Sequence, residues 1–481
     1  MRSRVIARLV GSFLQVFAAI LLIPLVVGVY YNEPIEILFG YSVAAIASVF
    51  LGYIINYFGA SEEPTTKEAV SSTVAGWLLA IIFGAVPFLV FLSPVDAVFE
   101  SAAGITTTGI SMFLEPELLP DSLLFWRSFL QWIGGLGVLT FFIAVIRETG
   151  GASRRLFSAE QHKTDPGTVR PSLTKTIIAL WKVYILITVL ITAAYYALGT
   201  SFRDALLHTF SVVSTGGFST MSESIAGFGS TQIEIATIFF MLIGGSNFVL
   251  LYAALKGKPK TYLKNTEFKT YIKIFLVLSI ILTLDLFRRG FSTDRALVEG
   301  FFQSAAVLTS TGYTTISVMS FSIAIQALLI GVMFVGGSLG STSGGFKTFR
   351  LITLFRLLKT RLRSYSLPES AINEVKIDDE IIDNETLRTI SVLFFAWVMV
   401  IFAGTVLTLI TEDMTITSAL SGVVSSASNM GPVYMEHFDM VQMNPITKIV
   451  WSLVMLAGRL EMLPLLAIFN SNILTSTKHD N

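Results

Sequence analysis

Four short tracts of hydroxyl, amide and glycine residues interrupt the long apolar stretches of this chain. The tracts are TTTG at 106–109, STGG at 214–217, STGY at 310–313 and SNMGP at 428–432. Carbonyl and hydroxyl oxygens in such tracts can replace the hydration shell of a desolvated cation. Glycine suits this use because it permits backbone angles that turn carbonyl groups inward and adds no side chain to the lumen. The chemistry that these residues offer is therefore the coordination of a cation.

The predicted ion-binding filter takes three residues from each tract. They are Thr107, Thr108, Gly109, Ser214, Thr215, Gly216, Ser310, Thr311, Gly312, Asn429, Met430 and Gly431. A single Ser-Thr-Gly sequence in a membrane protein is more often a turn or a close helix contact, so the prediction depends on the fourfold recurrence. Because Asn429 and Met430 replace hydroxyl residues, the predicted ring is only approximately fourfold.

The composition indicates an integral membrane protein. The 481 residues are 53% hydrophobic and 14% charged, with a mean hydropathy of +0.71, and the apolar runs of about 20 residues favour helices that span the bilayer. Equal numbers of basic and acidic residues, 33 of each, give no indication of a nucleic-acid partner. With no Cys and four scattered His, thiolate sites are excluded and a zinc cluster is disfavoured. No nucleophile with a base is visible, so we expect neither an enzyme nor a covalent cofactor.

The elements form a repeat that predicts the fold class. We expect an all-α polytopic membrane protein with four helix, re-entrant pore loop, helix repeats around a central pore, preceded by an N-terminal transmembrane hairpin. The hairpin occupies 1–70, with helices at 9–29 and 37–58, and the repeats occupy 71–170, 171–268, 269–365 and 366–481. The first helices are predicted at 73–92, 177–198, 271–287 and 387–410, and the short helices at 95–105, 203–213, 295–308 and 416–427. The second helices are predicted at 123–146, 233–255, from 323 onward, and at 446–469.

The distribution of charge predicts the topology. Basic residues such as Arg147, Lys256 and Arg356 follow the second helices, and the positive-inside rule places these segments in the cytoplasm. Segments 111–122 and 433–445 contain no Lys or Arg and are expected outside. Ten helices then cross the bilayer, both termini are cytoplasmic, and each short helix enters the membrane from outside. Backbone at this depth must be buried in protein or line water, so the four tracts are expected to converge.

A second set of residues is predicted to form a gate. GGSLGSTSGGF at 336–346 interrupts an apolar helix, where each glycine disfavours helix by about 1 kcal/mol relative to alanine. A phosphate-binding loop is excluded because phenylalanine follows its last glycine. Arg459 and Glu461, placed deep within the last helix, either form a structural ion pair or lie beside the pore. The predicted gate residues are Gly336, Gly337, Gly340, Gly344, Gly345, Lys347, Arg459 and Glu461.

The repeated tracts, together with FKTFR at 346–350 and AGRLEMLP at 457–464, resemble the Trk/Ktr/HKT superfamily of potassium transporters, and the TrkH branch in particular. The resemblance implies a potassium-uptake subunit of a prokaryotic plasma (inner) membrane, with K⁺ as the transported ion. It further implies a homodimer with one pore per protomer, bound to a cytosolic ring of nucleotide-binding regulatory subunits of the TrkA-like RCK/KTN type. The family's filter glycines correspond to Gly109, Gly216, Gly312 and Gly431, and glycine at all four positions favours potassium over sodium.

The resemblance also implies that 336–346 is a flexible gating loop and that Arg459 presents a positive barrier beneath the filter. Two other mechanisms stay open at this point. One is a sodium- or proton-coupled symporter of the same fold, and the other is a secondary carrier without a pore. Such carriers often use inverted repeats, whereas the repeats here share one orientation. Because the chain contains no G-x-G-x-x-G motif, any nucleotide control must come from another subunit.

Overall fold

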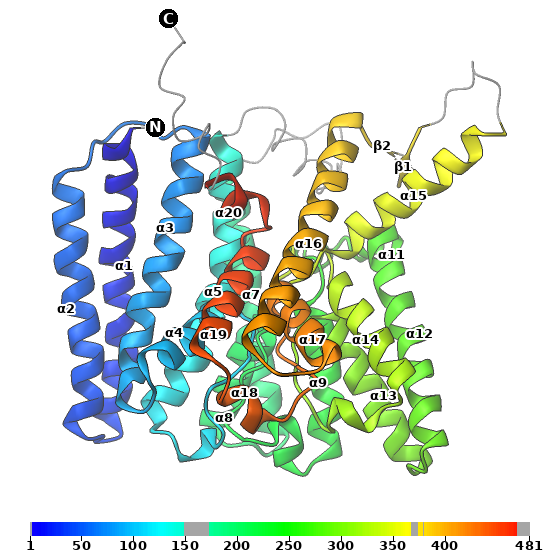
Figure 1. Ribbon diagram of the computed structural model, residues 1–481, viewed down its shortest axis with the longest axis horizontal. Coiled ribbons are helices and arrows are strands. Elements are labelled where there is room, and N and C mark those ends of the chain that lie inside the picture. The colour runs from blue at the N-terminus through cyan, green and yellow to red at the C-terminus, as the bar shows by residue number, and fades with distance from the viewer. Residues whose placement is uncertain (1, 149–172, 367–373, 379, 469–481) are drawn as a thin grey trace, which may run out of the picture.

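The computed structural model describes residues 2–148, 173–366, 374–378 and 380–468, and these residues are mostly helical (Figure 1). Among the described residues, six helices are long and apolar enough to cross a membrane, at Ser3–Tyr30, Ile35–Tyr57, Lys67–Val90, Ile178–Ala197, Thr266–Arg288 and Asn384–Thr411. Within the described ranges the only strands, β1 (Lys376–Ile377) and β2 (Glu380–Ile381), form one small antiparallel pair. The chain is therefore an all-α multi-pass membrane protein, as the sequence predicts.

The first two helices form the predicted N-terminal hairpin. Helix α1 (Ser3–Tyr30) and helix α2 (Ile35–Tyr57) lie side by side at one edge of the molecule (Figure 1). They approach closely because both carry glycine at the crossing: a methyl group at Gly11 would lie 2.7 Å from the carbonyl oxygen of Gly52. Small residues allow this packing between membrane helices, where no hydrophobic force favours association.

The next two units follow the hairpin. The first consists of α3 (Thr66–Ala85), η1 (Val86–Val90), α4 (Pro94–Ile105), η2 (Pro116–Leu118) and α5 (Asp121–Glu148). The second consists of α7 (Leu173–Ala197), α8 (Phe202–Val213), η3 (Ser224–Phe228), α9 (Thr231–Gly244), α10 (Phe248–Leu255) and α11 (Pro259–Lys264). The predicted boundary between these units at 170/171 lies outside the described residues.

The last two units have the same order of elements. The third consists of α12 (Thr266–Arg288), α13 (Thr293–Leu308), η4 (Val318–Ser320), α14 (Ile323–Val335) and α15 (Thr348–Ser364). The fourth consists of α16 (Asn384–Thr411), α17 (Ile416–Ser428), α18 (His437–Val441), α19 (Pro445–Arg459) and α20 (Leu463–Ile468). The division of the chain into domains and the count of ten crossings stay predictions.

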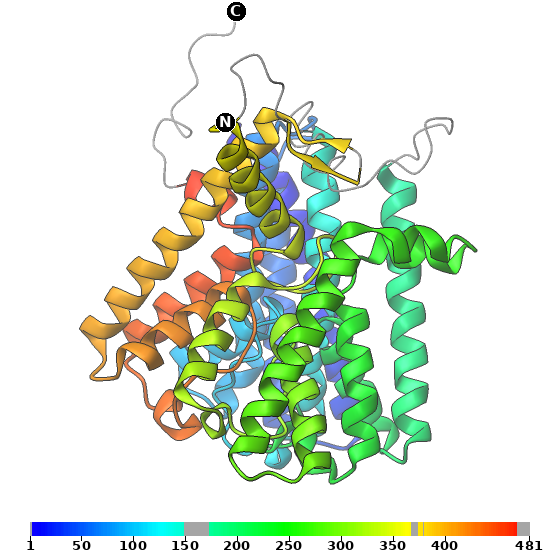
Figure 2. The ribbon, with the colours of Figure 1, turned by 90° about the vertical axis from the view of Figure 1, so that its right-hand side faces the viewer.

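The short helices α4, α8, α13 and α17 lie in one half of the molecule, whereas α11, α15 and the strand pair lie at the opposite end (Figures 1 and 2). Three of the four begin at a hydroxyl N-cap: the side chains of Ser93, Ser201 and Thr415 each accept a hydrogen bond from the backbone amide three residues later. Such caps satisfy amides that the helix itself leaves free. Each short helix then runs directly into one of the polar tracts.

Two predicted continuous helices are wrong. The apolar run 233–255 is broken between α9 and α10, which are bent by 101°. Asn247 caps the new helix, since its Oδ1 accepts hydrogen bonds from the amides of Val249 (2.9 Å) and Leu250 (3.2 Å). The run 446–469 also ends early, at Arg459, because Glu461 and Met462 adopt left-handed conformations with φ of 62° and 58°. Glu461 therefore lies in a turn between α19 and α20 and not within a helix.

Candidate ion pathway

The four tracts meet one another in a closed ring. If a methyl group is placed at the glycine of one tract, it lies against a carbonyl oxygen of the next tract. The four contacts are Gly109 to Gly216 at 2.0 Å, Gly217 to Thr311 at 2.0 Å, Gly312 to Met430 at 1.8 Å and Gly431 to Thr108 at 3.0 Å. The order is thus first, second, third, fourth and back to first. Segments more than 300 residues apart in sequence lie in contact, as the convergence argument predicts.

All four tracts share one backbone conformation. Each has a left-handed non-glycine residue one or two positions after the last residue of the short helix, namely Thr107 (φ 57°), Thr215 (φ 54°), Ser310 (φ 53°) and Asn429 (φ 50°). Each has a left-handed glycine two positions later, namely Gly109 (φ 80°), Gly217 (φ 80°), Gly312 (φ 74°) and Gly431 (φ 106°). Left-handed non-glycine residues are uncommon, and the surrounding contacts must hold them in place. Four occurrences at equivalent positions indicate one conserved local design rather than four separate turns.

This register corrects one assignment made from the sequence. Gly216 does not correspond to Gly109, Gly312 and Gly431. It occupies the position of Thr108, Thr311 and Met430, and Gly217 is the equivalent glycine. The sequence STGG offers two adjacent glycines, and the comparison of motifs alone selected the wrong one. The distance from the helix end was an available signal, since Gly109, Gly217 and Gly312 each follow the last residue of their helix by four positions.

Side-chain oxygens divide into two groups around the ring. The hydroxyl groups of Thr106, in the first tract, and Thr309, directly before the third, donate to carbonyls of their own helices at 2.6 Å and 2.7 Å. By contrast, among the described residues Thr107 Oγ1 and Asn429 Oδ1 are buried and have no hydrogen-bond partner. A buried oxygen without a partner is costly unless a ligand or water satisfies it. Backbone carbonyls and these free oxygens are therefore the groups available to a cation.

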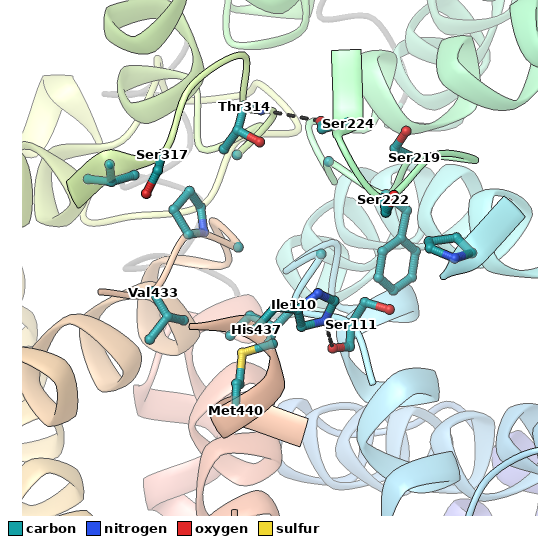
Figure 3. A pocket seen from close by; sticks show the side chains of 18 of the residues that line it. Ile110, Ser111, Ser219, Ser222, Ser224, Thr314, Ser317, Val433, His437 and Met440 are labelled. Carbon is teal, nitrogen blue, oxygen red and sulfur yellow. Dashed lines mark hydrogen bonds between the residues drawn. The ribbon is translucent and has the colours of Figure 1, made fainter. Parts of the chain in front are cut away.

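A polar cavity of about 320 Å³ opens directly beyond the glycine end of the ring (Figure 3). All four left-handed glycines line it, together with residues from the loops that follow each tract. Hydroxyl side chains from three of these loops surround the cavity, including Ser111, Ser219, Thr314 and Ser317. The cavity is large enough for a hydrated ion and lies where an ion must pass to reach the ring. It thus has the position and polarity of an entrance vestibule.

The segment 336–347 lies against the other end of the ring. The backbone amide of Gly344 donates to Ser310 Oγ at 2.6 Å, so the segment contacts the third tract. Thr342 Oγ1 donates to the carbonyl of Val213 at 2.8 Å, at the end of the second short helix. A methyl group at Gly344 would lie 2.0 Å from the carbonyl oxygen of Ser428 in the fourth tract. The segment therefore contacts the second short helix and the third and fourth tracts on the side of the ring away from the cavity.

The predicted gate glycines hold this segment in a compact conformation. Gly336 (φ 73°), Gly340 (φ 70°) and Gly345 (φ 79°) are all left-handed. A methyl group at Gly336 would lie 2.2 Å from the carbonyl oxygen of Gly344, and one at Gly337 would lie 2.7 Å from that of Gly245. Larger residues cannot occupy these positions without a shift of the backbone.

Arg459 is buried and fastens the segment to a different unit. Its Nη1 donates to the carbonyl of Thr342 at 2.8 Å, and its Nη2 donates to the carbonyl of Gly134 in α5 at 3.0 Å. Of the two interpretations of Arg459 and Glu461, a mutual ion pair is not seen, because Glu461 pairs with Arg350 on α15. Lys347 also belongs to this region, and its ammonium group donates to the carbonyl of Ser343.

Several residues of this region were not recognised in the sequence. Glu267, which is 3% exposed, accepts a hydrogen bond from the amide of Leu339 at 2.6 Å and so anchors the start of the segment to α12. Arg350 forms the ion pair described above, and Thr342 bridges the end of the second short helix and Arg459. Thr342 and Arg350 lie within segments singled out in the sequence, 336–346 and 346–350, but the partners of all three residues depend on tertiary contacts that no local pattern indicates.

The fold and this ring define a multi-pass membrane protein of the cation-transport class. Residues 58–478 match the TrkH family, described as a cation transport protein. The chain is 32% identical over 488 residues to the Trk system potassium uptake protein TrkH of Escherichia coli K12, covering 98% of this chain and 99% of that protein. The chain therefore belongs to the TrkH family.

Two further comparisons agree with this assignment. An uncharacterized cation transporter of Methanocaldococcus jannaschii is 30% identical over 471 residues, covering 96% of this chain and 94% of that protein. The crystal structure of the potassium transporter TrkH from Vibrio parahaemolyticus superposes with a TM-score of 0.88 at 28% identity, covering 98% of this chain and all of that one. The similarity thus extends over almost the whole chain, including the hairpin.

Proposed function

We propose that this chain carries out potassium uptake across a prokaryotic plasma membrane, with K⁺ passing through the ring of four tracts. The observation that carries the proposal is the closed ring, in which each left-handed glycine lies against a carbonyl oxygen of the next tract. Such a ring can offer several backbone carbonyls to one dehydrated cation. The names of the relatives, which describe potassium uptake, support the choice of ion.

In this proposal the transported ion is K⁺ and no covalent cofactor takes part. The filter consists of Thr107, Thr108, Gly109, Thr215, Gly216, Gly217, Ser310, Thr311, Gly312, Asn429, Met430 and Gly431. Ions enter from the vestibule and meet the carbonyls after they lose water. The negative ends of the dipoles of the four short helices face the ring and favour a cation over an anion.

The segment 336–347 acts as the gate. Its contacts with three units and its bond to Arg459 support this role, because movement of the segment would clear the inner side of the ring. The ion pair between Arg350 and Glu461 links the gate to α15 at the end of the molecule opposite the short helices. A cytosolic partner that moves α15 would then move the gate. We assign this part to a nucleotide-binding regulatory subunit of the TrkA-like type, since the chain has no dinucleotide motif of its own.

The chain acts as a homodimer with one pore per protomer, in the inner membrane, with both termini in the cytoplasm. The positions of basic residues support this orientation: Lys256, Lys258 and Arg361 lie near the end of the molecule where α1 begins and where α11 and α15 lie. The positive-inside rule assigns this end to the cytoplasm. The vestibule then faces outside, as uptake requires.

Ion flux into liposomes that contain the purified protein tests the proposal. Uptake of Rb⁺, an analogue of K⁺, should be inhibited by K⁺ at much lower concentration than by Na⁺ or Li⁺. Gly312→Ser should weaken this preference, because a side-chain carbon at Gly312 would lie 1.8 Å from the carbonyl oxygen of Met430 in the fourth tract. Equal inhibition by Na⁺ and K⁺ would refute the proposed K⁺ selectivity. The absence of flux both with and without the regulatory subunit would refute the proposed pore.

A further inference from the structure

A buried network of side chains lies behind the outer ends of the first and second tracts. Glu100 on α4 is completely buried, and its carboxylate binds Arg127 of α5, with 2.7 Å between Oε1 and Nε. The other carboxylate oxygen accepts the backbone amide of Met112 at 2.6 Å. The Arg127 guanidinium is 2% exposed and lies 4.3 Å from the centre of the Phe218 ring. A buried ion pair of this kind is maintained only if further hydrogen bonds satisfy both groups.

These further hydrogen bonds reach both tracts. Arg127 Nη2 donates to Ser111 Oγ at 2.9 Å, two residues beyond the glycine of the first tract. Arg127 Nη1 donates to the carbonyl of Ser219 at 3.2 Å, two residues beyond the glycine of the second tract. One planar guanidinium thus connects the outer ends of two adjacent tracts, and both serines line the vestibule (Figure 3). Arginine suits this task because its donors form a rigid fork.

The second tract has a brace at the equivalent position. His208 precedes Thr215 by seven residues, as Glu100 precedes Thr107, and its Nε2 lies 3.0 Å from Ser219 Oγ. Its Nδ1 lies 2.9 Å from the carbonyl oxygen of Asp204, so both ring nitrogens have a partner. The imidazole ring thus supports Ser219, the residue whose carbonyl Arg127 binds.

At this position of the short helix, the third and fourth tracts carry no such brace. Gln303, at the equivalent position of the third, is buried, and both polar atoms of its amide lack partners among the described residues. Gly422, at the equivalent position of the fourth, leaves room for the ring of Trp451, which a methyl group would meet at 2.0 Å. The loops after these two tracts are held from other positions, since Glu299 accepts a hydrogen bond from the Thr315 hydroxyl and Ser421 Oγ accepts one from the amide of Tyr434. What distinguishes the first two tracts is that one buried arginine, Arg127, joins their outer ends directly.

We infer that the Glu100–Arg127 network is a selectivity-determining clamp, in which Arg127 and Glu100 are positioning residues that hold the outer end of the filter at the width suited to K⁺. The inference rests on the proposed filter. A ring of carbonyls discriminates against a smaller ion only if it resists contraction around that ion. The clamp supplies this resistance on two sides by tying Ser111 and Ser219 to one rigid guanidinium.

Binding of ions to the detergent-solubilised protein provides a test that does not depend on the gate. A ligand that binds only the folded protein raises its melting temperature with concentration, so titrations with K⁺ and Na⁺ give two apparent affinities. In Glu100→Gln and Arg127→Lys we expect the K⁺ affinity to fall by about tenfold with little change for Na⁺, because each variant loses charge-assisted hydrogen bonds. Ser111→Ala removes only the hydrogen bond between Arg127 and the loop after the first tract. It should lower the ratio of K⁺ to Na⁺ affinity by a smaller factor.

Charge alone predicts a different result. Arg127 lines the vestibule, so Glu100→Gln leaves an unbalanced positive charge there, whereas Arg127→Gln leaves a negative one. An electrostatic role would change the affinities for K⁺ and Na⁺ together, in opposite directions in the two variants, with the ratio preserved. That result would overturn the clamp. A positioning role requires both variants to lower the K⁺/Na⁺ ratio.

Glu68→Gln is the matched control. Glu68 is also a buried carboxylate paired with an arginine, Arg2, but it lies at the end of the molecule away from the tracts. The Glu68→Gln variant should have a lower melting temperature than the unmodified protein in salt-free buffer, but the same ratio of K⁺ to Na⁺ affinity. If Gly312→Ser lowers the ratio and the clamp variants preserve it, the clamp is refuted and the filter stands. If the unmodified protein shows no preference for K⁺, the filter is refuted and the clamp with it.

Discussion

Replacement of Arg459 by alanine should increase ion flux. The Arg459 guanidinium donates to the carbonyls of Thr342 and Gly134, and thereby ties the gate segment to α5 across the inner side of the ring. In our account the segment must leave this position for ions to pass, so both hydrogen bonds break on opening. The alanine variant lacks them in the closed state and loses nothing when the gate opens.

The size of the effect follows from these two bonds. A hydrogen bond to a charged group contributes about 1.5–3 kcal/mol, but desolvation of the buried guanidinium offsets part of the total. A net loss of about 2 kcal/mol from the closed state would shift the ratio of open to closed protein by roughly 30-fold. Removal of a positive charge from beside the path of a cation acts in the same direction.

Rb⁺ uptake into liposomes, normalised to the amount of folded protein, measures this change. Arg459→Lys is the informative companion, because lysine keeps the charge but has no planar fork with which to bridge two carbonyls. We expect an intermediate flux from it. Unchanged or reduced flux in Arg459→Ala, with normal expression and melting behaviour, would refute the assignment of Arg459 to the gate.

Three other outcomes follow from the structure. Gly312→Ala should weaken the K⁺-dependent rise in melting temperature, since its methyl group would meet a carbonyl of the fourth tract at 1.8 Å; a normal rise would contradict the packing of the ring. Gly11→Val should destabilise the protein by about 1–3 kcal/mol in thermal unfolding, because it meets Gly52 in the hairpin, with flux per folded molecule unchanged. Burial raises the pKa of the Glu117 carboxyl, but hydrogen bonds from its own backbone amide and from the Ser222 hydroxyl and amide outweigh burial and hold the pKa below its ordinary value. Its stabilising effect is therefore present above that ordinary value and is lost as the pH falls through the lowered pKa, and Glu117→Gln should remove this part of the acid dependence of the melting temperature.

The short helices are the part of the fold that the sequence predicts best. The helix predicted at 203–213 is Phe202–Val213 in the structure, and the helix predicted at 416–427 is Ile416–Ser428. These helices carry local signals at both ends, a hydroxyl N-cap at the start and a polar tract at the end. The convergence of the tracts also followed from physical reasoning, because re-entrant backbone needs partners inside the membrane.

The breaks in the second helices were harder to predict. Most residues of the run 233–255 are apolar, and small residues such as Gly244 and Gly245 are common where membrane helices pack closely, so they do not by themselves predict a break. In the structure Gly244 ends α9, and Asn247 begins α10 as an N-cap. The hydrogen bonds that stabilise the bend come partly from elsewhere: the amide of Phe248 donates to the carbonyl of Gly340 in the gate segment at 3.1 Å. The residues near 248 in sequence give no indication of this distant partner.

The site shows the same division between local and tertiary information. Residue types located the ring of tracts to within one position, and the error at Gly216 arose because two adjacent glycines are equivalent by composition but not by conformation. The partners of Arg459 could not be assigned from sequence, since Glu461, two residues away, was the obvious candidate for an ion pair. Left-handed φ at Glu461 turns its side chain toward Arg350 instead.

The central claim is that a cation binds within the ring of four tracts. Anomalous diffraction from crystals of the protein grown with Tl⁺ or Rb⁺ in place of K⁺ tests it most directly. We expect an anomalous peak on the axis of the ring, within coordination distance of backbone carbonyls from all four tracts. Added K⁺ should weaken this peak more than the same concentration of added Na⁺. A peak confined to the vestibule, or none within the ring at saturating Tl⁺, would contradict it.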